Sequence, residues 1–92
     1  MIKFHYHVSE IGGISQHCCH VFSDAEDGEA ELLKWAEENE IPAEWMDKKN
    51  ELPHFDLWGG RLQLGGAGVS SKEFVKAARA WRRRQGKDQP IS

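Results

Sequence analysis

The stretch that decides the fold is MIKFHYHVSEIGGISQHCCHVFSD, residues 1–24. Its first eight residues alternate between apolar and polar side chains, which is typical of a β-strand with one face turned to a core. Residues 10–15 surround a pair of glycines and predict a turn or loop, and residues 17–22 predict a second short strand. His5 and His7 share one face of the first strand, because side chains two residues apart point the same way.

The middle of the chain predicts one helix followed by irregular segments. A capping box at residues 23–26 begins a helix that ends near Asn39 or Glu40, before Ile41-Pro42. Residues 43–47 form either a short strand or an extended connection. Residues 47–57 are polar, contain a proline and predict a surface loop.

The last third predicts two more helices. A short helix over residues 60–64 and a glycine-rich turn precede a second capping box at residues 70–73. The helix that follows is the clearest element, because its apolar side chains recur at the i, i+3, i+4, i+7 spacing. These side chains are Phe74, Ala77, Ala78 and Trp81.

Short strands that alternate with helices predict an α/β fold, with a small single-layer sheet of short strands and about three helices. Ligands of such folds bind at the carboxyl ends of the strands, where Ser23-Asp24 is expected to lie. The alternative is an α+β fold in which the first two strands form an N-terminal hairpin. The 92 residues make one domain, which we expect over residues 1–84 with a disordered tail over residues 85–92. We expect the four tryptophans to be mainly core residues.

The charge is unevenly distributed. The net charge is −3, but acids dominate residues 24–51 and bases dominate residues 61–92. The overall acidity argues against double-stranded DNA as a partner. A basic end suits either an anionic ligand or the acidic face of a second copy, so a homo-oligomer is one expectation. The N-terminus resembles no secretion signal and no apolar run approaches membrane-spanning length, so we expect a cytoplasmic protein with no membrane partner.

The five histidines are the first candidates for chemistry. His5 and His7 can direct two nitrogens at one divalent metal ion, with His20, Asp24, His54 and Asp56 as further ligand types. The alternative is that the histidines hydrogen-bond backbone or ligand directly. The run of residues 17–20 is too compressed for structural zinc. Its adjacent cysteines cannot form an unstrained disulfide with each other, so they are either buried thiols or, beside a histidine, nucleophiles.

The motif His54-Phe55-Asp56 points to a function, because it follows a proline in a polar segment and its two polar side chains share a side if extended. We predict His20, His54 and Asp56 as catalytic residues. Asp24 either caps a helix or binds ligand. Arg61, Ser70 and Ser71 are predicted to hold an anion, since a helix N-terminus offers free amides and an arginine can clamp phosphate at two points.

With these motifs in hand, the chain resembles a family of small bacterial and phage domains of unknown function. The matching features are His20-x-x-Ser23-Asp24, Leu32-x-x-Trp35-Ala36, Ile41-Pro42, His54-Phe55-Asp56, Arg61 and Gly66-Ala67. The family's late motif usually has tyrosine where this chain has Phe55. The resemblance implies no established activity, but it implies that the histidines, aspartates and arginine of these motifs belong to one site.

Three functions follow from this set of residues. The first is a module that binds a small anionic, nucleotide-like ligand, as a phage or bacterial protein that sequesters or degrades a nucleotide signal. The second is the enzymatic version, a phosphoester hydrolase that uses histidine and aspartate with or without a divalent metal. The third is a protein-interaction or homodimerisation module that uses the basic C-terminal helix.

Overall fold

The computed structural model of the chain describes residues 1–47 and 52–84. Three strands form one antiparallel sheet in the order β1-β2-β3, with two α-helices and two 3-10 helices around it. The elements are β1 (Ile2–Ile11), β2 (Ile14–Ser23), α1 (Gly28–Glu38), η1 (Ala43–Trp45), β3 (Phe55–Trp58), η2 (Gly59–Leu64) and α2 (Ser71–Arg84). The predicted small sheet of short strands with helices is confirmed, and the topology observed is the alternative with an N-terminal hairpin.

The hairpin joins β1 to β2 through the two-residue turn Gly12-Gly13. Both glycines have positive φ, 60° and 82°, which is the backbone that two-residue hairpin turns require for their twist to match that of the strands. The strands therefore extend further into residues 10–15 than the predicted turn allowed. Because β2 runs antiparallel to both of its neighbours, its carboxyl end at Ser23 lies at the opposite edge of the sheet from the carboxyl ends of β1 and β3, and the described strands lack the parallel arrangement on which the crevice expected at Ser23-Asp24 depends.

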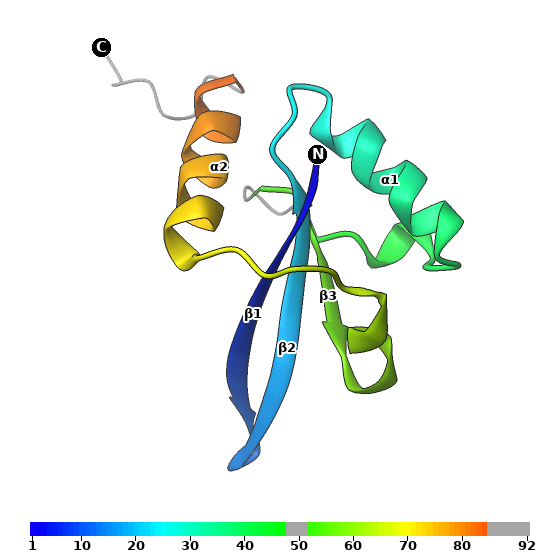
Figure 1. The fold of residues 1–92 in the computed structure, drawn as a ribbon, viewed down its shortest axis with the longest axis vertical. Coiled ribbons are helices and arrows are strands. Elements are labelled where there is room, and N and C mark those ends of the chain that lie inside the picture. Colours follow the sequence, from blue (N-terminus) through cyan, green and yellow to red (C-terminus); the bar gives the residue numbers. More distant parts are fainter. Residues whose placement is uncertain (48–51, 85–92) are drawn as a thin grey trace.

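The two helices cover opposite faces of the sheet (Figure 1). The first face packs on α1 through fully or nearly fully buried side chains: Cys19, Val21, Phe55 and Leu57 from the sheet, with Leu32, Ala36 and Ile41. The second face packs on α2 through a smaller cluster of Phe22, Leu52 and Ala77. Each large side chain enclosed in this way contributes roughly 1.5–3 kcal/mol to stability. Because α2 covers only part of its face, polar side chains can occupy the remainder.

The predicted loop over residues 47–57 is wrong at its C-terminal end, where β3 forms. Phe55 and Leu57 are buried while Asp56 is exposed, so this segment has the alternation of an edge strand with one face in the core. The strand pairs with β2, which satisfies its backbone on that side. Four residues of the predicted loop, 48–51, lie outside the described part of the chain.

The first capping box is also wrong, since α1 begins after Asp27 rather than at Ser23. The Ser23 hydroxyl accepts a hydrogen bond from the Ala25 amide at 3.1 Å and donates one to Glu31 at 2.6 Å, so it stabilises the turn before the helix. The second box forms in part, because Ser70 Oγ accepts from the Glu73 amide at 3.4 Å. Residues 43–45 form the 3-10 helix η1, neither of the two predicted conformations, and the short helix near residues 60–64 is confirmed.

The glycine-rich run before α2 packs against the outer strand β1. Val69 donates a backbone hydrogen bond to Phe4 at 2.8 Å, and the Tyr6 hydroxyl donates to the Gly66 carbonyl at 2.7 Å. A Cβ at Gly68 would come within 2.9 Å of the Tyr6 ring. These glycines therefore allow close packing.

The prediction that the tryptophans are mainly core residues holds for only part of them. Trp35 is half-buried against the α1 core, but Trp45 and Trp58 are 47% and 48% exposed. Among the described residues, no helix is both long and apolar enough to cross a bilayer. The predicted tail over residues 85–92 lies outside the described residues.

Candidate functional site

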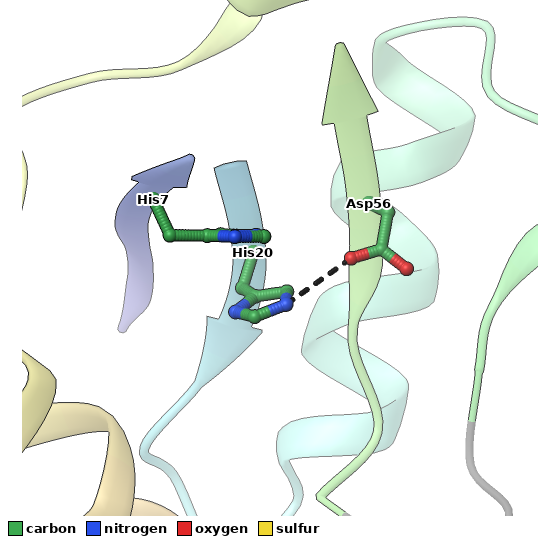
Figure 2. Close-up of side chains that lie close together, drawn as sticks. All are labelled: His7, His20 and Asp56. Carbon is green, nitrogen blue, oxygen red and sulfur yellow. Dashed lines mark ion pairs between the residues drawn. The ribbon is translucent and has the colours of Figure 1, made fainter. Parts of the chain in front are cut away.

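The sheet lines up a histidine, a second histidine and an aspartate on the face that carries α2. His5 of β1 pairs with His20 of β2, and His20 pairs with Asp56 of β3, so the three residues form one row across the strands. His7, two residues further along β1, stacks its ring on that of His20 with 4.1 Å between ring centroids. Figure 2 shows His7, His20 and Asp56 projecting from the three strands toward one another.

Asp56 stands between two imidazoles. Its Oδ1 lies 3.3 Å from His20 Nε2, and its Oδ2 lies 3.7 Å from His54 Nε2. The carboxylate is 40% exposed, whereas the side chains of His20 and His54 are 22% and 6% exposed. The aspartate therefore offers both a contact to each histidine and an open side to solvent.

His20 is partly buried and lies beneath the ring of Phe74 from α2, at a centroid distance of 4.9 Å. Burial chiefly, and then the neighbouring His7, His54 and His5, lower the pKa of His20 from 6.5 to about 4. The imidazole is consequently neutral near pH 7, so one of its nitrogens carries a proton and the other carries a lone pair.

A hydrogen-bonded chain leads from His20 to α2. His20 Nδ1 lies 3.3 Å from His5 Nδ1, and His5 Nε2 lies 3.0 Å from the Ser71 hydroxyl. Burial, and secondarily His7, lowers the pKa of His5. Ser71 thus touches the cluster and, through the two imidazoles, connects to Asp56.

His54 is held in one tautomer by the backbone. Its Nδ1 donates to the Leu52 carbonyl at 2.8 Å, which leaves the lone pair of Nε2 directed toward Asp56. Backbone hydrogen bonds of 2.9 and 3.0 Å between Asp47 and His54 hold the segment that follows η1 beside the residues that lead into β3. An imidazole oriented by a carbonyl in this way is typical of a metal ligand.

Two sets of three side chains have the composition and spacing of metal ligands. In each set one donor atom per residue lies within 4.8 Å of the others. The sets are His7, His20 and Asp56, and Asp47, His54 and Asp56. Imidazole with carboxylate suits zinc and other divalent first-row metals, and three protein ligands leave positions open for water or substrate.

The second ligand set opens on a pocket of about 350 Å³ lined by Trp45, Asp47, Asp56 and Trp58. The Arg61 guanidinium lies over the ring of Trp45, one of the lining residues, 4.7 Å from the ring centroid. Asp47 and both tryptophans are not among the site residues predicted from the sequence. The alternation of residues 55–58 is the signal that places Trp58 on the same face as Asp56, and it depends on the strand β3.

Two predicted ligand-binding residues lie outside the cluster. Ser70 caps α2, and Asp24 pairs with the N-terminal ammonium at 3.1 Å and with Lys3 at 3.1 Å. Burial by itself raises the pKa of Asp24, but hydrogen bonds from these two cations lower it on balance. Asp24 therefore belongs to an ionic group at the start of β1, because the turn into α1 directs it toward the N-terminus.

The cysteines are free and buried. Burial raises the pKa of Cys19 to about 11, so it is a thiol near neutral pH and not the thiolate that a nucleophile requires. Cys19 packs in the core beside Leu57 and Val21. This agrees with the simpler of the two expectations for residue 19.

Comparison of the chain with protein-family models, curated proteins and solved structures gives no match, so the family resemblance stays a prediction that rests on its motifs.

Proposed function

We propose that the protein binds a small phosphorylated, nucleotide-like ligand through a divalent metal ion held by Asp47, His54 and Asp56. In this proposal the ligand's phosphate completes the coordination of the ion, and its base lies against Trp45 or Trp58 in the adjoining pocket. The observation that carries the proposal is one pocket with two half-exposed tryptophans and two carboxylates beside an oriented imidazole.

The proposal needs a metal ion because the pocket itself is negatively charged. Asp47 and Asp56 would repel a phosphate from the pocket they line, because like charges in a partly enclosed site are unfavourable. A divalent ion bound between them reverses the sign of the local field and presents open positions to an anion. Arg61 adds a cation beside Trp45, where it is exposed and can move from the indole ring onto a phosphate.

The tryptophans argue for a ligand with a flat ring. An exposed indole forgoes the stabilisation that burial of so large an apolar surface gives. Aromatic platforms bind nucleobases by stacking, which is tolerant of base identity and worth about 1–3 kcal/mol per base. A tryptophan would hold the base of a nucleotide, and the metal beside it would hold the phosphate at the other end.

The enzymatic version of the proposal is hydrolysis of a phosphoester. An ion held by Asp47, His54 and Asp56 would activate the attacking water, whose oxygen would bond to phosphorus as the bond from phosphorus to the alcohol oxygen breaks. The neutral imidazole of His20 would take the proton from the water and give it to the departing alkoxide. Sequestration without turnover uses the same residues and lacks only this step.

Calorimetry tests the binding step. Protein freed of metal with chelator is titrated with Mn²⁺ and then with a panel of nucleotides, and we expect nucleotide binding only after metal is added. Asp47→Asn should weaken Mn²⁺ binding by more than about tenfold, the cost typical of losing even a group that only orients a ligand. Trp58→Ala should leave Mn²⁺ binding unchanged and weaken nucleotide binding by the 1–3 kcal/mol expected of one stacking contact.

His17→Gln is the matched control, because His17 is exposed on β2 and points to the opposite face of the sheet. It should change neither step. A folded wild-type protein that binds no divalent metal, or that binds metal but no nucleotide at millimolar concentration, would refute the proposal. Product analysis with and without chelator then separates hydrolysis from sequestration.

The biological setting we propose is the bacterial cytoplasm, where a phage or its host gains by removing a nucleotide signal. Two free buried cysteines suit a reducing compartment. This part of the proposal is tested by finding which nucleotide of an infected-cell extract remains on the metal-loaded protein after gel filtration.

A homodimer is the second candidate, favoured by the outer face of α2. Lys76, Arg79 and Arg83 are exposed there, and none of them forms an ion pair within the described residues. Exposed Glu37 and Glu38 on α1 supply an acidic surface of complementary charge in a second copy. Changing Lys76 and Arg79 together to glutamate should convert a dimer to a monomer in sedimentation. A wild-type monomer at high protein concentration would contradict this candidate.

A further inference from the structure

We propose that a second divalent cation binds between the three strands, held by His7, His20 and Asp56, so that Asp56 bridges two ions. The inference rests on the proposed function, because it adds a neighbour to the ion held by Asp47, His54 and Asp56. The two ligand sets share only the bridging aspartate.

The geometry of Asp56 carries the first step. Its two oxygens face different histidines, with Oδ1 3.3 Å from His20 Nε2 and Oδ2 3.7 Å from His54 Nε2. A carboxylate that gives one oxygen to each of two ligand sets is the usual bridge of a two-metal site, in which the ions lie about 3.5–4 Å apart. A single ion could bind only one of these oxygens and its histidine, and the other oxygen would face its histidine with no cation between them.

His7 supplies an independent observation. Its Nε2 is buried and has no hydrogen-bond partner among residues 1–47 and 52–84. A buried polar nitrogen without a partner is unfavourable, and a bound cation would satisfy its lone pair. Ser9 Oγ lies 3.4 Å from His7 Nδ1, and when that nitrogen donates, Nε2 keeps the lone pair that a cation requires.

The surroundings hold His20 ready for the same ion. Phe74 covers its ring, and His5 Nδ1 lies 3.3 Å from its Nδ1, the nitrogen turned away from Asp56. The hydroxyl of Ser71 holds His5 in turn at 3.0 Å. An outer layer of this kind fixes the orientation of a ligating imidazole and leaves only its Nε2 available.

A second ion changes the hydrolytic step. His20 then serves as a ligand and no longer accepts the proton. The two ions would activate the attacking water, which would lose its proton to solvent as its oxygen bonds to phosphorus, and the departing alkoxide would take a proton from solvent as its bond to phosphorus breaks. The ions stabilise the attacking and leaving oxygens, as in other paired-metal sites.

Metal stoichiometry tests the inference with Zn²⁺ alone, followed by Mn²⁺ as a magnetic probe. Protein loaded with Zn²⁺ and freed of excess by gel filtration should contain two ions per chain by atomic emission. His7→Phe, which keeps a flat ring over His20, should contain one ion. His17→Gln should still contain two.

Each outcome decides a different point. One ion per chain in the wild-type protein, unchanged in His7→Phe, overturns the second site and leaves the proposed function standing. No bound ion overturns both. Should His7→Phe fail to fold, paramagnetic resonance of the wild-type protein decides: two Mn²⁺ at bridging distance must show spin coupling, and two uncoupled Mn²⁺ signals overturn the inference.

Discussion

Lowering the pH should destabilise the metal-free protein well above the range in which its carboxylates titrate. His20 has its pKa lowered from 6.5 to about 4, chiefly by burial. The unfolded chain therefore takes up a proton near pH 6.5, whereas the folded protein resists protonation until about pH 4. The stability is complete above pH 6.5 and is lost progressively as the pH falls toward 4.

The magnitude follows from the size of the shift. The full difference between the two pKa values corresponds to about 3 kcal/mol, and about 2 kcal/mol of it should already be lost at pH 5. That is a large part of the 5–15 kcal/mol typical of a small domain. Glu31 and Glu73 do not contribute in this range, because the N-terminal ammonium and Lys3, respectively, lower their pKa values.

Urea unfolding followed by tryptophan fluorescence at pH 8, 7, 6 and 5, with chelator present, measures the effect. His20→Gln cannot titrate and should lose most of the decrease in the free energy of unfolding between pH 8 and pH 5. His17→Gln should retain it. If His20→Gln loses as much stability over this range as the wild-type protein, the burial of His20 does not govern the acid response and the reasoning is refuted.

Four further substitutions test the fold by the same unfolding assay. Phe55→Ala removes a fully buried ring from the α1 core and should lower the free energy of unfolding by about 3–5 kcal/mol, and a loss under 1 kcal/mol would contradict the burial described. Gly13→Val places a branched residue at a φ of 82° and should cost about 1–2 kcal/mol, while Gly12→Asn, at a φ of 60°, should be nearly neutral; equal effects would argue against the turn. Gly68→Ala should cost about 1–3 kcal/mol, because its Cβ would meet the Tyr6 ring, and a stabilised variant would show that this packing is looser than described.

Much of the fold could be predicted from local pattern. Alternating side chains marked β1, and the spacing of Phe74, Ala77 and Trp81 marked α2, since both signals depend only on the side-chain periods of strand and helix. The hairpin was one of two alternatives because the glycine pair allows either a tight turn or a loop. Choosing between them required the pairing of His5 with His20, which no local pattern determines.

The sequence does not predict β3, because the strand is short and begins two residues after Pro53. Its four residues gain their strand structure from pairing with β2, so a nonlocal contact overrides the polar composition of the segment before it. The same contact carries Asp56 to His20. The site was therefore predicted in its chemistry, as histidines with an aspartate, while its walls of Trp45 and Trp58 depend on a strand that local pattern did not indicate.

The N-terminal hairpin has a consequence for the order in which the protein assembles. Its strands are joined by two residues, so closing it requires almost no search, and hairpins of this kind form in roughly 1–10 μs. His7 and His20 are thus brought together early in folding or as the chain leaves the ribosome, before Asp56 has been positioned. We expect the imidazoles of the nascent hairpin to be able to bind a metal ion while the rest of the domain is still unfolded.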